Sequence, residues 1–302
     1  MSLKKRLEDY YRGRADQKEF TDSDLPETRP QLFRAVLSVR KREMVGLNML
    51  CLLIWLPAVV WTVINYVQLN AMAGQASAQQ LGDLLFSYLL VLAPLIAIAA
   101  PFNAGASYVM CNWARDEHSE LRGDFLPAVR ENWKQSLAFG AINGAAPLLI
   151  YVAGRFYAQL ARTQGALFYL PLALLLALGL IWLLMAQLMP ALMVNYAFGF
   201  GEQLRTALTL VLRALPLCLG VKLLTLAVPA LFLALVLLVP QAEALATTIV
   251  SLLYALFWLS FNRLIVASLS NALCERELNP HIEGARCRIG LRPLRGEAPR
   301  KK

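Results

Sequence analysis

Two basic residues stand out because each lies alone in a long apolar segment. Lys222 is the single ion in residues 214–240, and Arg263 is the single ion in residues 244–274. An ionised side chain inside a membrane span is costly, so it indicates either a functional site or a polar contact between helices. Both residues lie nearer the predicted inner end of their segments. The Lys222 side chain can reach the membrane interface more easily than the Arg263 side chain can. The sequence leaves the functional and the structural role open.

The partners of Arg263 can be anticipated from what the spans contain. An arginine cannot lose its charge in a protein, and the apolar segments contain no aspartate or glutamate. We therefore expect Arg263 to point into the bundle and toward the cytoplasm. Its expected partners are the side chains of Asn103 and Asn195 or carbonyl groups released near Pro101 and Pro190.

Enzymatic chemistry has little support. The sequence has no G-x-x-x-x-G-K-[ST] phosphate loop. An acidic cluster beside a histidine comprises Asp116, Glu117, His118 and Glu120. It lacks a nucleophile, so a solvated turn is the better interpretation. An irregular trio of metal-ligand types comprises Cys274, His281 and Cys287, and unrelated residues explain it better than a zinc site. We predict no catalytic residue, metal or cofactor.

The segments that must position these residues are membrane spans. Of the 302 residues, 58% are hydrophobic and only 16% are charged, which is unlike an ordinary soluble enzyme or a disordered chain. Nearly charge-free stretches occupy residues 45–69, 84–113, 136–154, 166–201, 214–240 and 244–274. About 20 apolar residues cross the hydrocarbon core. The sequence predicts an all-α, polytopic helical membrane protein with six transmembrane helices.

The basic residues predict the orientation. Of the 29 Lys and Arg, 11 precede residue 45 and 8 follow residue 271. On the opposite side, residues 70–83 and 241–243 have none and residues 155–165 have two. Excess Lys and Arg mark the cytoplasmic side, so both termini are predicted to be cytoplasmic. This bias accounts for most of the net charge of +9. We therefore predict the lipid bilayer, and no nucleic acid, as the partner of the basic tail, with RNA contact as the weaker alternative.

Three regions follow from this map. Residues 1–44 form a cytoplasmic tail that contains a basic amphipathic helix over 30–44, residues 45–273 form the membrane domain, and residues 274–302 form a basic cytoplasmic tail. Inside the membrane domain, spans two and four are expected to break at Pro101 and Pro190. Each break serves either as a kink for packing or as a gate.

A cytoplasmic amphipathic helix is expected after each break, which suggests a unit used twice in the same direction. In residues 124–137 the apolar stripe contains Phe125, Val129 and Trp133, and in residues 202–215 it contains Leu204 and Leu208. Positions three or four residues apart share one face of a helix. These side chains are expected to face the bilayer interface or the undersides of the spans.

One set of motifs resembles the YesL family of small bacterial integral membrane proteins. The motifs are LNMLCLLIWLP at 47–57, PFNAGASY at 101–108, and the D-F and N-W-K groups at 124–125 and 132–134. The resemblance covers roughly residues 45–220, and the long amino-terminal tail departs from it. It implies a Gram-positive plasma membrane and a genomic setting beside carbohydrate import, and it implies no catalytic residue.

These observations favour a non-enzymatic membrane accessory or scaffold protein, associated through the resemblance with a carbohydrate uptake system of the ABC type and its membrane transport subunits. The alternative is a transporter or channel that acts alone through a polar path near Lys222 and Arg263. Neither the solute nor the oligomeric state follows from the sequence.

The predicted orientation can be tested by labelling in whole cells. Cysteines introduced at Gln75 and Glu243 should react with an impermeant thiol reagent from outside, because they lie in the turns without basic residues. Cysteines at Glu120 and Arg295 should stay unlabelled until the membrane is permeabilised. External labelling at Glu120 would reverse the orientation.

Overall fold

The computed structural model describes residues 25–72 and 74–293, and in this part of the chain the regular structure is entirely helical. Outside the described residues lie 1–24 and 294–302, which contain most of the predicted amino-terminal tail and the end of the basic tail. The principal helices are α2 (Arg29–Val39), α3 (Lys41–Ala71), α4 (Ala78–Trp113), α5 (Leu121–Gln164), α6 (Tyr169–Asn195), α7 (Phe200–Arg213), α8 (Leu215–Leu238), α9 (Glu243–Leu253) and α10 (Leu259–Glu277). Six helical segments are long and apolar enough to span a membrane, which confirms the predicted fold class.

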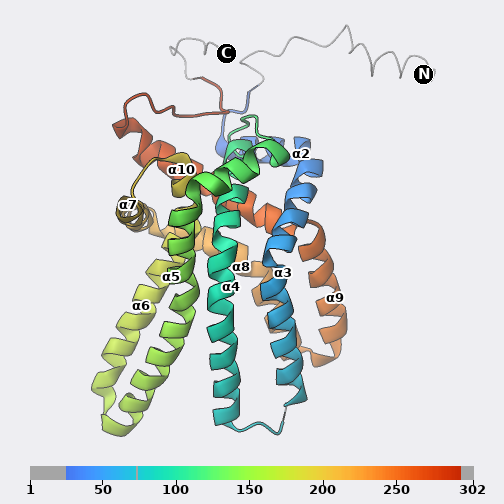
Figure 1. Ribbon diagram of the computed structural model, residues 1–302, viewed down its shortest axis with the longest axis vertical. Helices are drawn as coiled ribbons and strands as arrows, with labels where there is room; N and C mark the ends of the chain where they lie inside the picture. Colours follow the sequence, from blue (N-terminus) through green and yellow to red (C-terminus); the bar gives the residue numbers. More distant parts are fainter. Residues whose placement is uncertain (1–24, 73, 294–302) are drawn as a thin grey trace, which may run out of the picture.

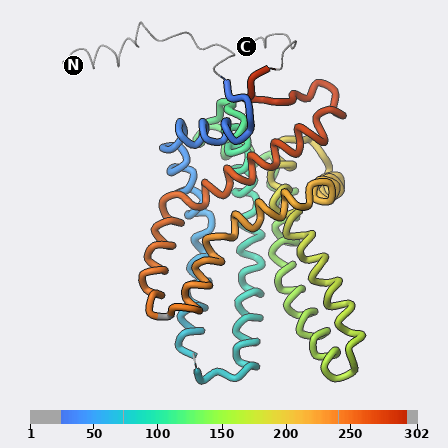
Figure 2. Tube along the Cα trace, turned by 180° about the vertical axis from the view of Figure 1, so that it is seen from behind, coloured from blue at the N-terminus to red at the C-terminus, as the bar shows by residue number. Residues whose placement is uncertain are grey.

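The bundle has two distinct ends (Figure 1). The α2 end contains α2, α7 and the residues that follow α10. The hairpin end contains the α3–α4 and α5–α6 turns. Helices α3 to α6 run lengthwise between these ends, whereas α8 and α10 run obliquely across them (Figure 2). Because α10 contacts α3, α4, α6 and α8, it ties the two halves of the bundle together.

The predicted helix breaks at Pro101 and Pro190 are wrong. Helix α4 continues past Pro101 to Trp113, and α6 continues past Pro190 to Asn195. A proline removes one backbone hydrogen bond, and in a membrane bundle neighbouring helices stabilise the backbone around it. Pro101 is buried, and Pro190 is half-buried between the buried residues Met189 and Ala191.

The two connecting helices differ, so the predicted repeat holds only in outline. The first is not a separate element, because α5 runs without interruption for 44 residues from Leu121 to Gln164. Figure 1 shows its first turns lying across the α2 end before the helix turns along the bundle. The second connecting helix, α7, is separate, because Ala214 leaves helical geometry before α8 begins.

The amino-terminal amphipathic helix is shorter than predicted. Helix α2 ends at Val39, and residues 41–44 already belong to α3. Leu32 and Val36 of α2 are buried against the protein, and the Arg40 guanidinium lies 5.6 Å from the centre of the Trp113 ring. The apolar face of α2 is therefore covered by the protein itself.

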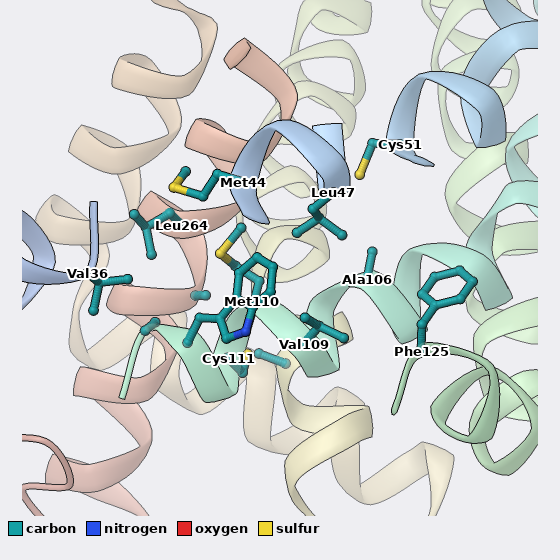
Figure 3. Close-up of a cluster of buried hydrophobic side chains, with 14 of the residues drawn as sticks. Val36, Met44, Leu47, Cys51, Ala106, Val109, Met110, Cys111, Phe125 and Leu264 are labelled. Carbon is teal, nitrogen blue, oxygen red and sulfur yellow. The ribbon is translucent and has the colours of Figure 1, made fainter. Parts of the chain in front are cut away.

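The main hydrophobic core lies near the α2 end (Figure 3). It draws on α2, α3, α4, α5, α6 and α10. Its members include Val36, Met44, Leu47, Cys51, Ala106, Val109, Met110, Cys111, Phe125 and Leu264. A second cluster joins α5, α6, α7, α8 and α10 around Leu188, Leu192 and Leu210. Toward the hairpin end the leucines of α6 and α8 are exposed, as expected of helices that face lipid.

Span six contains a π-helical segment, Tyr254–Trp258, between α9 and α10. A π-bulge leaves backbone groups without their usual partners, and Asn48 of α3 binds them. Its Nδ2 donates to the carbonyl oxygens of Tyr254 and Ala255 at 2.9 and 2.7 Å, and its Oδ1 accepts from the Ser260 amide at 3.1 Å. The chain changes direction at this segment (Figure 1), which sets the oblique course of α10.

Helices α4 and α5 approach closely along their length. A Cβ atom at Gly140 would lie 3.0 Å from the Ala97 Cα, and one at Gly144 would lie 3.0 Å from the Ala93 Cα and collide with the Ala93 carbonyl oxygen. Near the hairpin end the Tyr151 hydroxyl donates to the Gly82 carbonyl oxygen at 2.8 Å. Small residues permit such contact between membrane helices.

Gly144→Ala should therefore destabilise the protein by about 1–3 kcal/mol, the usual cost of overpacking. Gly154→Ala is the matched control on the same helix, because nothing lies within 4 Å of the added Cβ. It should be neutral or stabilising by up to about 1 kcal/mol through helix propensity. Thermal unfolding in one detergent measures both, and equal midpoints for the two variants would contradict the close contact.

Candidate functional site

Arg263 lies on α10 and points into the bundle against α3 and α4. Its Nε donates to the Cys51 sulfur at 3.1 Å, and its Nη1 donates to the Ser107 Oγ at 3.2 Å and the Asn103 carbonyl oxygen at 3.3 Å. Its Nη2 donates to the Asn103 Oδ1, which also accepts from the Trp55 Nε1 at 3.2 Å. An arginine has five N–H donors, so these contacts use four of them.

Of the two expected side-chain partners, the structure brings Asn103 to Arg263 and places Asn195 elsewhere. The Asn195 Oδ1 accepts from Arg115 Nη2 at 3.2 Å, and Arg115 also binds the Asn112 Oδ1 at 2.8 Å and the Glu117 carboxylate at 2.9 Å. Asn195 ends α6, next to the turn that follows α4. The prediction that Asn195 contacts Arg263 is wrong, because Arg115 in the turn after α4 binds the Asn195 side chain instead.

Lys222 and Arg263 line one cavity of about 220 Å³ between α4, α6, α8 and α10. We call it the Lys222 cavity. Its polar lining consists of Ser107, Gln187, Lys222, Thr225, Asn262 and Arg263. None of the described residues that line it is acidic. The structure thus brings together the two residues that the sequence singled out, and the cavity between them carries two positive charges.

Two residues that line this cavity each have a buried amide oxygen without a hydrogen-bond partner within the described residues. These oxygens are the Gln187 Oε1 and the Asn262 Oδ1. The amide nitrogens of both side chains are used, because Gln187 donates to the Cys218 carbonyl oxygen at 3.0 Å and Asn262 donates to the Thr225 carbonyl oxygen at 3.3 Å. The Lys222 ammonium likewise has no partner among the described residues.

A second cavity of about 220 Å³ lies on another side of Arg263 and includes Trp55, Asn103, Ser136 and Asn143. Arg263, Ala186 and Pro190 line both cavities. Pro190 cannot donate a backbone hydrogen bond to the Ala186 carbonyl, so α6 presents a weakened turn at the place where the two cavities meet Arg263.

The first amphipathic stripe packs against the spans at two of its three positions, and the buried face of α7 differs from the second stripe. Phe125 and Val129 are buried against α4, whereas Trp133 is 48% exposed and Lys134 lies beside its ring. On α7, Leu204 is partly buried and Leu208 is 38% exposed. The buried positions of α7 are Gln203, Ala207, Leu210 and Val211. Val211 belongs to the predicted stripe, which also runs through Leu215, and is buried as expected. The other three buried positions each precede a stripe residue by one, so the protein-facing side of α7 is rotated from the predicted stripe and Leu208 lies on the outer side.

Residues outside these predictions also hold the site in place. Asn48 fixes the bend before α10, and Asn271 donates to the Cys111 carbonyl oxygen at 2.9 Å. The sequence feature that could have identified both residues is an asparagine within an apolar span, because such a residue tends to bind a neighbouring helix. At the α2 end, the Tyr196 hydroxyl donates to the Asn279 Oδ1 at 2.5 Å. Burial raises the pKa of Tyr196 above its ordinary value, so the hydroxyl stays protonated and can donate.

The acidic cluster forms ion pairs within its own turn. Glu117 pairs with Arg115, and His118 lies 3.7 Å from Glu120 at the surface. In the tail, Cys274 is buried in α10 and Cys287 is exposed. Within residues 25–72 and 74–293, no group of three or more His, Cys, Asp or Glu side chains is arranged to hold a metal ion.

Comparison with known proteins gives one similarity. A family model described as a protein of unknown function, DUF624, matches residues 80–153, and this domain occurs in YesL-like proteins. The matched segment covers most of α4 and α5, including Asn103, and ends before Lys222 and Arg263. No curated protein and no solved structure matches the chain. The chain is thus a helical membrane protein with a segment similar to this family.

Proposed function

We propose that this protein is a non-enzymatic accessory or scaffold subunit of a membrane assembly. The observation that carries the proposal is the binding of Arg263 by its own chain. Four of its five donors are held by α3 and α4, so the most conspicuous polar residue of the spans joins helices. An arginine used in this way stabilises a framework.

Helix α8 supplies a surface for a partner. All of its residues are described, and Cys218 is the one that is buried, whereas α6 buries eight residues against the rest of the protein. The exposed side chains of α8 include Leu223, Leu224 and Leu231. A span so weakly packed in its own bundle suits contact with a membrane subunit of another protein.

The proposed assembly is a carbohydrate uptake system of the ABC type in the plasma membrane of a Gram-positive bacterium, with both termini in the cytoplasm. The link to carbohydrate rests on the YesL-like motifs at 47–57 and 101–134 and on the similarity of residues 80–153. The orientation rests on the distribution of Lys and Arg.

A transporter or channel that acts alone is the second candidate. The observation that favours it is the pair of cavities on two sides of Arg263, with Pro190 of α6 at both. Movement of α6 at this proline would join the cavities into a path. Solute uptake by the purified protein in liposomes, without other polypeptides, would select this candidate.

Substitution of Arg263 tests the structural role. Arg263→Leu should lower the free energy of unfolding by about 2 kcal/mol, because hydrogen bonds from a charged group are lost. Arg263→Lys should fall between wild type and the leucine variant, since lysine keeps the charge but lacks the planar fork. Thermal unfolding in detergent measures both. A leucine variant as stable as wild type would remove the basis of the proposal.

Co-purification tests the accessory role. The tagged protein, extracted in mild detergent, should bring down membrane transport subunits in fixed stoichiometry. Leu231→Trp on α8 should reduce this yield several-fold by placing a bulky side chain in the contact, whereas Leu174→Trp, at an equally exposed position of α6, should leave it unchanged. Absence of any stoichiometric partner, together with solute uptake by the protein alone, would refute the accessory role.

A further inference from the structure

We propose that the Lys222 cavity binds a phosphate ester that carries hydroxyl groups. The cavity is lined by Lys222 and Arg263 and by Gln187 and Asn262, and each of these two amides has an oxygen that is unpartnered among the described residues. It lies between four helices in the membrane-spanning part of the bundle. Nothing in this inference depends on whether the protein works alone or with a partner, so it extends beyond the proposed function.

The charge of the cavity calls for an anion. Lys222 has no ion-pair partner among the described residues, and Arg263 binds only neutral groups. Two positive charges facing one space at low dielectric repel each other, and an anion between them removes this penalty. The four hydrogen bonds of Arg263 hold the guanidinium in one position before a ligand arrives, which limits the entropy lost on binding.

The number of donors favours a phosphate. The Lys222 ammonium has three N–H donors, and the Arg263 guanidinium has one of its five N–H donors left. The partly buried Ser107 and Thr225 hydroxyls lie in the same lining, although each already donates to a backbone carbonyl. A lysine acts as a point charge toward phosphate, and an arginine adds a directed donor.

The two unpartnered amide oxygens indicate what the phosphate carries. Gln187 is 7% exposed, and its Oε1 is buried without a partner among the described residues, as is the Oδ1 of Asn262. A buried acceptor left without a donor is costly. Hydroxyl groups next to the phosphate would supply these donors once the two amide groups turn toward the bound ligand. The cavity, at about 220 Å³, is smaller than the ~300–1,000 Å³ typical of drug-sized ligands, so the bound group is compact.

Two sources share this chemistry, namely a small soluble phosphate ester and the headgroup of a glycerophospholipid. For the soluble source, calorimetric titration of the purified protein in detergent, at constant ionic strength, compares glycerol 3-phosphate with inorganic phosphate. We expect saturable binding of glycerol 3-phosphate that is tighter than binding of inorganic phosphate. Lys222→Gln should weaken it about ten-fold or more, because a charge-assisted contact is lost.

For the lipid source, nanodiscs of phosphatidylcholine alone are compared with nanodiscs that also contain phosphatidylglycerol. Phosphatidylglycerol should raise the Tm of the wild type, and Lys222→Gln should abolish the rise. Lys222→Arg keeps the charge and should retain binding in both assays. Lys41→Gln is the matched control, because it removes one exposed positive charge at the start of α3, away from the cavity.

Binding in either assay that depends on Lys222 and not on Lys41 supports the proposal and identifies the source. If Lys222→Gln folds poorly, Asn262→Leu replaces it and should abolish the preference for glycerol 3-phosphate over inorganic phosphate, or for phosphatidylglycerol. The proposal is overturned if neither ligand binds, or if both Lys222→Gln and Asn262→Leu behave as wild type.

Discussion

A guanidinium in the hydrocarbon region must find its hydrogen-bond partners within the protein, because lipid tails offer none. Arg263 meets this demand through α3 and α4, which lie far from it in the sequence. The oblique course of α10 brings it there, and that course depends on the π-helical segment Tyr254–Trp258 and on the Asn48 contacts that satisfy its carbonyls. The Arg263 contacts, the π-helical segment and the Asn48 bonds together thus determine the position of the last span and of both cavities beside Arg263.

Much of the architecture can be predicted because the lipid bilayer requires each span to be a long apolar segment. Runs without charge are long enough to cross the bilayer, and they correspond to the six spans. The contact between Arg263 and Asn103 can also be predicted from the sequence. The spans contain few polar groups, and a permanently charged guanidinium must form hydrogen bonds with them. When few polar partners or few possible spans exist, the composition and spacing of the residues are sufficient to predict the structure.

Other features depend on packing, which a single sequence does not contain. Pro101 and Pro190 indicate helix breaks by local rules, yet their neighbours keep both helices intact. The π-helical segment has no residue signature of its own. On α7 the apolar positions cover more than one face, so periodicity alone misplaces the buried side by about one residue. The Lys222 cavity combines four helices, and only their arrangement reveals the two unpartnered amides.

The contacts of span six also have a consequence for biogenesis. Asn48 donates to two carbonyl oxygens of the π-helical segment and accepts from the Ser260 amide, and the Cys111 carbonyl oxygen accepts from Asn271. These partners emerge late from the ribosome. Until that segment inserts, the amide of Asn48 lacks these partners in a medium that supplies none. The α4–α5 hairpin, in contrast, joins neighbours in the chain through small residues and can assemble early. Completion of the chain therefore acts as the closing step of assembly, because a translation product that stops before the π-helical segment Tyr254–Trp258 leaves the Asn48 amide without these partners in the membrane.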